Sequence, residues 1–405
     1  MIKIAVLGYG TVGSGVIEVL NKNGTSINER ANKEIKVKYV LDLKDFPGDP
    51  VQDLIVHDYN IIVNDPEVQI IVEVMGGVNP AYDFVKEALE KGKSVCTSNK
   101  ELVAKHGAEL LALAKAKKVN FLFEASVGGG IPIIRPLNQS LTADEIQEIT
   151  GILNGTTNYV LSKMTTEGHK FNGVLEDAIE KGYAERNPEA DIKGYDACRK
   201  IAILTSLAYG MQVDYEDIYT EGITKITDID IKYAKALKAN IKLLGTSRKE
   251  DDKVYAMVAP MLIDNKHPLY SVNDEFNGIF VKGNVLGDIM FYGRGAGKLP
   301  TASAVVSDVV DAAKHIGTNI MTIWSSKKLG LSDVNDYKTK YLVRLLGDES
   351  KNYFLVKELF GEVTKVKAEG VNDEYGFITP IITEGEFKEQ ISKLDNVLGR
   401  IRVAM

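Results

Sequence analysis

The sequence predicts an α/β protein in three regions: a doubly wound, mostly parallel sheet, an α+β region, and a small C-terminal domain of βαββαβ order. Two observations predict the first region. A glycine-rich turn lies between an apolar strand and a helical pattern at the start of the chain, and strand and helix patterns then alternate to about residue 127. Such alternation is typical of a parallel sheet with helices on both faces.

The first elements predict a nucleotide site. Ile2–Leu7 is a short apolar run, Gly8-Tyr9-Gly10-Thr11-Val12-Gly13 follows it directly, and apolar residues recur at helical spacing from Val16. A G-x-G-x-x-G motif needs this strand–turn–helix context to bind a dinucleotide. The glycines allow a pyrophosphate to approach closely, and the helix N-terminus offers N–H donors and a partial positive charge. We therefore expect a Rossmann-type domain.

The other elements of this first domain, residues 1–127, follow from the same patterns. We expect strands at Lys3–Leu7, Ile35–Asp42, Ile70–Met75, Ser94–Ser98 and Asn120–Ala125, and helices at Val12–Asn21, Ala81–Glu90 and Leu102–Ala116. A helix rich in small residues, Thr301–His315, is expected to pack back on this domain and complete it with residues 299–320.

Residues 128–298 predict an α+β domain for substrate binding and dimerisation. It opens with Gly128-Gly129-Gly130-Ile131-Pro132 and mixes helices with strands at Glu145–Leu153, Lys253–Ile263 and Gly278–Lys282. We expect the sheet edges between Lys253 and Lys282 to be covered by a second copy, which predicts a homodimer.

After a linker at Asp333-Val334-Asn335-Asp336, residues 340–405 predict the small domain. Its elements are strand Tyr341–Leu345, helix Asn352–Phe360, strands Val363–Glu369 and Gly376–Ile382, helix Glu386–Val397 and strand Arg400–Ala404.

Composition indicates a soluble enzyme of the cytoplasm. The 405 residues carry a net charge of −7 with both signs spread along the chain, which argues against nucleic acid or an anionic membrane as partner. No apolar run approaches the length of a membrane span, and the chain enters a core strand at once rather than a signal peptide. Only Cys96 and Cys198 occur, and no Cys/His cluster predicts zinc.

The segment Gly182–Lys200 gathers charge at a break between helices. Its carboxylates are Glu185, Glu189, Asp191 and Asp196, and Pro188 ends any helix that runs in from Leu175. The next helix is expected to begin near Ile192 or Gly194, with Asp191 as its cap.

Asp196 and Lys200 then lie one turn apart on one face of that helix. A lysine beside carboxylates at such a junction can hold an ammonium-bearing substrate and move a proton. The alternative that spacing alone leaves open is a solvated face with an ordinary ion pair.

Six motifs occur in an order that resembles homoserine dehydrogenase over about the first 320 residues. They are Gly8–Gly13, Thr97-Ser98-Asn99-Lys100, Glu124–Ile131, Asn154-Gly155-Thr156-Thr157-Asn158, Gly182–Lys200 and Gly293–Ala302. The resemblance implies reduction of L-aspartate 4-semialdehyde to L-homoserine with NAD or NADP.

The resemblance also implies roles for single residues. Lys200 would deliver the proton, and Lys100 would lie where cofactor and substrate meet. Glu185 would bind the substrate amino group, Asp196 would lie on the substrate side, and the substrate pocket would further include Asp191, Tyr183 and Thr156. The cofactor would contact Gly8, Gly10, Thr11, Val12, Gly13, Asp42, Ser98, Lys100, Gly182, Gly295 and Gly297.

The same resemblance implies a site for a monovalent cation at Glu124, Val127, Gly129 and Ile131. One carboxylate and three backbone carbonyls suit a hard, weakly charged ion such as sodium. From the residues alone, Gly128–Gly130 is a turn between domains.

The cofactor site departs from a common family pattern in one place. Many members have an arginine after the second strand, which suits a 2′-phosphate, whereas this chain has Leu41-Asp42-Leu43-Lys44-Asp45 and no arginine between Arg30 and Arg135. A carboxylate here usually accepts from a free ribose 2′-hydroxyl and repels a phosphate. We expect NAD to serve at least as well as NADP, although Lys44 leaves the preference open.

The tail resembles an ACT-type regulatory domain in element order. Its first turn, Gly347–Lys351, lacks the Pro-Gly often found where such domains bind amino acids, so a threonine effector and a purely dimerising role both stay open.

Two other functions remain as alternatives: another dehydrogenase of a small amino or hydroxy acid, and a non-catalytic dinucleotide sensor. A sensor would have no need of the set Glu185, Asp196 and Lys200.

Overall fold

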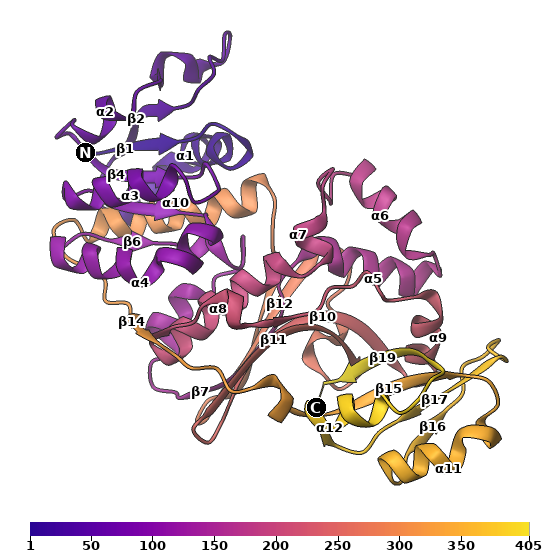
Figure 1. The fold of residues 1–405 in the computed structure, drawn as a ribbon. Helices are drawn as coiled ribbons and strands as arrows, with labels where there is room; N and C mark the ends of the chain where they lie inside the picture. Colours follow the sequence, from indigo (N-terminus) through magenta and orange to yellow (C-terminus); the bar gives the residue numbers. More distant parts are fainter. Residues whose placement is uncertain (405) are drawn as a thin grey trace. The chain divides into compact units, whose positions relative to one another are not determined.

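The computed structural model describes residues 1–404, apart from the side chains of residues 349–352. The chain forms two compact units, and each contains segments that are far apart in the sequence (Figure 1). Unit 1 comprises residues 1–145, 202–215 and 293–329, and unit 2 comprises residues 146–201, 216–292 and 330 onward. No helix within residues 1–404 is both long enough and apolar enough to cross a bilayer.

Unit 1 contains the predicted parallel sheet. Its strands are β1 (Ile2–Leu7), β2 (Ile35–Leu41), β3 (Ile55–Val56), β4 (Val68–Glu73), β5 (Ser94–Thr97) and β6 (Phe121–Leu122). Every pair is parallel and the order is β3-β2-β1-β4-β5-β6. The order reverses between β1 and β4, and ligands of doubly wound sheets bind beyond the carboxyl ends of the strands at this point. The predicted Rossmann-type fold is confirmed.

The helices of unit 1 include one that comes from far along the chain. They are α1 (Thr11–Ala31), α2 (Tyr59–Val63), α3 (Ala81–Glu90), α4 (Lys100–Lys117) and α10 (Lys298–Lys314). Helix α10, orange in Figure 1, lies among the indigo and purple elements of the unit, as predicted for residues 301–315.

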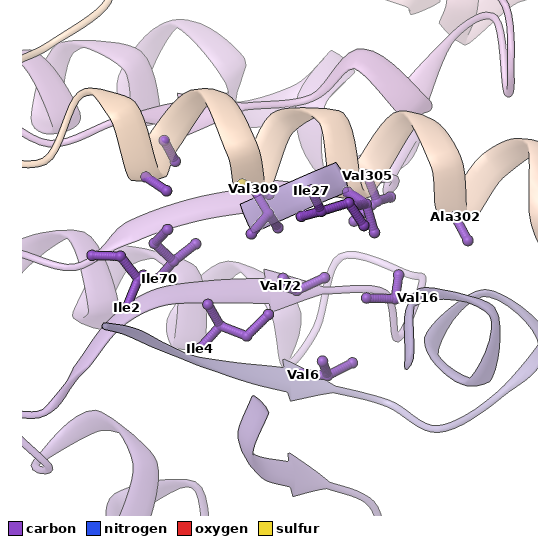
Figure 2. Packing of buried hydrophobic residues seen from close by; sticks show 14 of the residues in the cluster. Ile2, Ile4, Val6, Val16, Ile27, Ile70, Val72, Ala302, Val305 and Val309 are labelled. Atoms are coloured by element: carbon purple, nitrogen blue, oxygen red, sulfur yellow. The ribbon is translucent and has the colours of Figure 1, made fainter. Parts of the chain in front are cut away.

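Small residues let α1 and α10 approach each other closely. A Cβ on Gly15 would lie 2.9 Å from the carbonyl oxygen of Lys298 and 3.0 Å from Cβ of Ala302. The two helices share a buried apolar cluster with β1 and β4, in which Val305 and Val309 pack toward the strands (Figure 2). This cluster fixes α1, whose N-terminus carries the glycine turn.

Unit 2 is built on a mixed sheet of 11 strands. The main order is β13 (Gly287–Arg294), β12 (Phe276–Gly283), β7 (Ile146–Ile152), β10 (Ala239–Glu250), β11 (Lys253–Asp264), β19 (Val397–Val403), β15 (Lys338–Leu346), β17 (Glu374–Ile378) and β16 (Thr364–Val366), with β9 (Tyr219–Thr220) beside β11 and β18 (Ile382–Thr383) beside β15. Its helices are α5 (Gly155–Glu167), α6 (Phe171–Glu180), α7 (Glu189–Ile192), α8 (Tyr195–Tyr209, assigned to this unit up to Ile201), α9 (Asp228–Ala236), α11 (Glu349–Phe360) and α12 (Glu384–Ile391).

The tail follows the predicted βαββαβ order, but it is not separate from the middle region. Strand β19 pairs with β11 through Met261 and Leu262, so the two sheets are continuous. Buried Arg402 of β19 donates to Glu384 and to Glu221, and Arg344 of β15 donates to Asp230 of α9. The compact units therefore divide the chain differently from the three predicted domains.

Other differences have local causes. Helix α1 is twice as long as predicted, because it continues through Asn23, whose φ and ψ are not helical. Residues 334–336, predicted as part of a linker, form a 3-10 turn in which Asn335 accepts from Lys388 of α12. The edges of the sheet are not where the sequence predicts them: β11 and β12 are interior strands, and β13 and β16 form the edges. A further strand pair, β8 (Met211–Gln212) with β14 (Ser325–Lys328), belongs to unit 1.

Candidate active site

The predicted site residues fall into a nucleotide group on unit 1 and a charged group on unit 2. In unit 1, the turn between β1 and α1 requires glycine at Gly8 and at Gly13. Gly8 has a φ of +100°, and a Cβ on Gly13 would lie 1.9 Å from the carbonyl oxygen of Gly8. No side chain caps the N-terminus of α1 at Gly10. Its first N–H groups, which begin at Thr11 and Val12, are therefore suited to an anion such as a pyrophosphate.

Asp42 lies directly after β2 and beside this turn. Its carboxylate accepts from the backbone N–H of Tyr9 at 2.8 Å and of Lys44 at 3.0 Å. It lines a cavity of about 530 Å³ together with Gly8, Gly10 and Lys44. The length of α1 accounts for the large separation between Asp42 and the glycines.

A histidine that sequence reasoning did not select lines the same cavity. Nδ1 of His57 lies 2.7 Å from the carbonyl oxygen of Asp42, and Nε2 lies 3.2 Å from Oδ1 of Asp45. The backbone contact with Asp42, followed by the charge of Asp45, raises the pKa of His57. The cavity thus has basic groups at Lys44 and His57 beside the acid at Asp42.

A buried carboxylate organises the carboxyl ends of β4 and β5. Glu73 accepts from Thr97 Oγ1 at 2.7 Å and from the N–H of Met75 at 2.8 Å, and burial raises its pKa. Asn99 caps α4 through the N–H of Leu102 at 3.1 Å. The predicted residues Ser98 and Lys100 flank this cap, and Lys100 is the first residue of α4. Sequence reasoning missed Glu73, although a lone acid that ends an apolar strand is a readable signal.

The predicted cation loop packs against the segment before α10. Gly129 has a φ of +57°, and a Cβ there would lie 2.3 Å from the carbonyl oxygen of Gly295. Gly130 donates its N–H to the carbonyl of Arg294 at 3.1 Å. Gly297, with a φ of +117°, is the N-cap of α10. These contacts require glycine at Gly129, so the loop is more specific than an ordinary turn.

The carboxylate of the predicted cation site already accepts hydrogen bonds, and the site itself stays a prediction. The carboxylate of Glu124 accepts from three consecutive N–H groups, those of Ile133, Ile134 and Arg135, at 2.6 to 2.8 Å. It therefore stabilises the backbone that follows the loop, and any cation here would be bound by carbonyl oxygens. Among the side chains that the structure describes, no group of three or more His, Cys, Asp or Glu is arranged to hold a metal.

The charged group of unit 2 is centred on Lys200. Its ammonium group donates to Asp196 Oδ2 at 2.8 Å, one turn away on α8, and to the carbonyl of Leu153 at 2.8 Å. Lys200 is 8% exposed and Asp196 is 4% exposed. This burial excludes the alternative of a solvated surface ion pair, whose contribution is usually small.

Asp191 and Asn154 complete the cluster. The side-chain amide of Asn154 donates to Asp191 Oδ1 at 2.7 Å and to Asp196 Oδ2 at 2.9 Å. Burial, and then the charge of Asp196, raises the pKa of Asp191. Asp191 is not the predicted helix cap: it lies inside the single turn α7, and α8 begins only after Gly194, whose φ is +84°.

The remaining predicted residues lie on the loop that leads into α7, except Thr156, which contacts this loop from α5. Thr156 donates from Oγ1 to the carbonyl of Tyr183 at 2.7 Å, and the ring of Tyr183 lies 4.8 Å from that of Tyr159. Gly182, with a φ of +75°, donates its N–H to Ile179 after the end of α6. Glu185 is exposed on the same loop. Thr156 therefore orders this loop, whereas the role of Glu185 stays a prediction.

Comparison with known proteins gives a single family. The model "Homoserine dehydrogenase, NAD binding domain" matches residues 8–124, and the model "Homoserine dehydrogenase" matches residues 132–310. The homoserine dehydrogenase of Bacillus subtilis is 34% identical over 98% of this chain and 95% of its own. That of Synechocystis is 43% identical over 85% and 83%. The chain belongs to the homoserine dehydrogenase family.

Solved structures of the family share the fold. A homoserine dehydrogenase from Thiobacillus denitrificans covers 100% of this chain and 98% of its own with a TM-score of 0.91 at 36% identity. A hyperthermophilic archaeal homoserine dehydrogenase mutant in complex with NADPH covers 77% and 97% with a TM-score of 0.65 at 28% identity. The chain is thus an NAD(P)-dependent oxidoreductase that interconverts L-aspartate 4-semialdehyde and L-homoserine.

Proposed function

We propose that Lys200 supplies the proton in the reduction of the aldehyde and that Asp196 orients it. Hydride transfer to the aldehyde carbon builds negative charge on the oxygen, and a nearby ammonium can stabilise that charge and then protonate it. The observation that carries the proposal is the buried Lys200, which directs two of its three donors to Asp196 and Leu153. One donor remains for the substrate oxygen.

The other substrate and cofactor contacts follow the family. We assign the substrate amino group to Glu185, with Asp191, Tyr183 and Thr156 as further substrate-side residues. Lys100, at the start of α4, is assigned to the place where the nicotinamide and the substrate meet, with Ser98 and Gly182 beside the cofactor. What supports these assignments is position. Lys100 is the first residue of α4, and Gly182 follows the end of α6.

For the cofactor, NAD(H) is proposed to serve at least as well as NADP(H). The carboxylate of Asp42 faces the cavity beside the glycine turn, where the adenosine ribose of a Rossmann cofactor lies. It is suited to a ribose 2′-hydroxyl and repels a 2′-phosphate. Lys44 and His57, which line the same cavity, would favour the phosphate, so the preference depends on their balance.

The test of the function is a spectrophotometric assay of the purified full-length chain. NADH and NADPH are each mixed with L-aspartate 4-semialdehyde, and NAD and NADP with L-homoserine. We expect oxidation of the reduced cofactor with the semialdehyde and its formation with homoserine. Activity confined to another small amino or hydroxy acid would replace the proposed substrate, and cofactor binding without turnover on any of them would leave a sensor.

A sodium ion is proposed at the loop of Glu124, Val127, Gly129 and Ile131. The support is a set of close-packed carbonyls in a loop that needs glycine, and hard monovalent ions prefer oxygen ligands. Equal concentrations of sodium chloride and choline chloride should give different thermal stability. Identical melting curves would count against the ion.

A homodimer is proposed through the edge strand β13. Val285, Leu286, Met290 and Tyr292 are exposed on or beside this strand, and an exposed apolar edge strand favours pairing with another chain. Light scattering at micromolar concentration should give twice the mass of the chain, and a monomer would contradict this interface.

The tail is proposed to bind an amino-acid effector such as threonine, in the manner of an ACT domain. A cavity of about 640 Å³ lies between the turn at Gly347 and residues 367–375, and Asp348 and Lys367 line it with both signs of charge. A zwitterion needs both signs. Millimolar threonine should lower the rate, and an unchanged rate would remove the effector assignment.

The cytoplasm is the proposed location. Neither Cys96 nor Cys198 forms a disulfide although both are buried, which suits a reducing compartment.

A further inference from the structure

Asn154 occupies an unusual position, because one side chain serves both a helix and a pair of acids. It lies two residues after the end of β7 and is the N-cap of α5, where its Oδ1 accepts from the N–H of Thr157 at 2.9 Å. Its amide nitrogen faces the other way and donates to both Asp191 and Asp196. Since the helix N–H fixes which end of the amide is the acceptor, the amide nitrogen must face the two carboxylates.

This arrangement addresses an electrostatic problem. Two carboxylates that converge on one group raise each other's pKa, and burial adds to that effect. Asn154 offers each of them a donor without adding charge. Lys200 brings a cation to the same group, because it donates to Asp196 Oδ2, the oxygen that also accepts from the amide. The titratable groups that face the amide are therefore Asp191 from α7 and Asp196 with Lys200 from α8.

The backbone next to Asn154 acts on the same lysine. The carbonyl of Leu153 accepts from Lys200 Nζ at 2.8 Å. The turn between β7 and α5 thus contacts the cluster twice, once through a carbonyl that receives the lysine and once through an amide that holds both acids. A shift of this turn would move all three side chains together.

We propose that Asn154 is a positioning residue for the reaction, which holds Asp191 and Asp196 together and so sets the direction of the Lys200 ammonium. This inference rests on the proposed role of Lys200 as proton donor. Asn154 touches neither reactant in this role, and it acts through Asp196.

The alternative is that Asn154 only caps α5, and one substitution separates the two roles. Asp is as good an N-cap as Asn, so Asn154→Asp retains the acceptor for Thr157. It removes both donors and places a third carboxylate against Asp191 and Asp196. Asn154→Ala removes both roles. Thr383→Ala, which removes the N-cap of α12, is the matched control for loss of a cap alone.

We expect Asn154→Asp to lower kcat on the order of 10- to 100-fold, because misplacement of a catalytic group by about 1 Å costs that much. The pH profile of kcat should move to higher pH by about one unit, since the added carboxylate stabilises protonated neighbours. The dissociation constant of NADH, measured by fluorescence, should stay near wild type, whereas the melting temperature should fall, because the added carboxylate is buried beside two others. Thr383→Ala should change the melting temperature and leave the pH profile in place.

A folded Asn154→Asp enzyme with the wild-type kcat and pH profile would overturn the proposal and leave a helix cap. If Asn154→Asp does not fold, Asn154→Ser replaces it: the hydroxyl can cap but is too short to reach both acids, and the same loss of kcat is expected. In a Lys200→Ala background, Asn154→Asp should cost almost nothing more, because residues that act as a unit are not additive.

The Lys200→Ala variant also separates this proposal from the proposed function. If Lys200→Ala retains activity, the proton donor is wrong whatever Asn154 does. If Lys200→Ala is inactive and Asn154→Asp behaves as wild type, only the positioning role fails.

Discussion

Replacement of Lys200 by methionine keeps most of the length of the side chain and removes its charge and donors. Loss of a general acid typically lowers the rate about 10²–10⁴-fold, which corresponds to ~3–5 kcal/mol of transition-state stabilisation. The same change breaks a buried ion pair, which by itself costs roughly 3–5 kcal/mol of stability. The loss of stability should be near the lower limit of this range, since Asp196 keeps its hydrogen bond from Asn154.

The two effects are separated by a second substitution. Asp196→Asn combined with Lys200→Met leaves no buried charge in the pair, so the melting temperature should recover while kcat stays low. Steady-state kinetics with NADH and L-aspartate 4-semialdehyde gives kcat, and fluorescence titration gives cofactor affinity. We expect this affinity to be unchanged, because the proposed nucleotide site is at Gly8–Gly13. Lys393→Ala, which breaks an exposed pair with Glu389 at 3.0 Å, is the control for an ordinary ion pair.

If kcat of the double variant returned together with its stability, Lys200 would serve the fold alone and would not be the proton donor. A single variant that is folded and keeps more than about a tenth of the wild-type kcat would assign the proton to another group such as Lys100 or water.

Three further predictions concern other parts of the chain. Asp42→Ala should shift kcat/KM toward NADPH, and a wild-type enzyme that prefers NADPH about tenfold or more would contradict the role given to Asp42. Burial lowers the pKa of Lys242 to about 7, so between pH 7 and 10 the unfolded chain holds a proton that the folded chain has lost, and stability should rise with pH across this window. Chemical denaturation should show that the free energy of unfolding rises across this window by on the order of 4 kcal/mol, less what the three acceptors around Nζ contribute. Lys242→Met should lack this rise. Removal of residues 340–405 should give insoluble protein rather than an active core, since it strips β19 from β11, and soluble truncated enzyme at wild-type kcat would show that the tail is independent.

The sequence predicted the first region well because its signals are local. Each parallel strand is an apolar run of a few residues, and the glycine turn marks where the first one ends. The same reasoning placed the helix after residue 298 on this region from its small residues alone. It failed where local and tertiary preferences differ: Asn21–Thr25 has the composition of a break, yet α1 continues because Ile27 and Ala31 are buried against the sheet.

The middle region was harder to predict, and strand β10 shows why. Its residues Ala239–Glu250 contain Lys242, Gly245 and Arg248, which are poor indicators of a buried strand. Lys242 is buried only because Asn158, Val272 and Asn273 supply three acceptors from other elements. The sequence pattern does not predict β10, so it leaves β11 as an apparent edge strand. The predicted dimer interface therefore rests on strands that lie inside the sheet.

The candidate site divides in the same way between near and distant partners. Asp196 and Lys200 could be paired from the sequence because they are four residues apart, whereas Asn154 lies 42 residues before Asp196 and 37 before Asp191. Arg402 and Glu221 are 181 residues apart, and the local sequence around them does not predict that they pair. Glu221 is followed by Gly222 and Ile223, and the N–H of Ile223 donates to the carbonyl of Ile192 at the end of α7. The tail is therefore connected, through Arg402 and the segment Glu221–Ile223, to Ile192, the residue directly after Asp191.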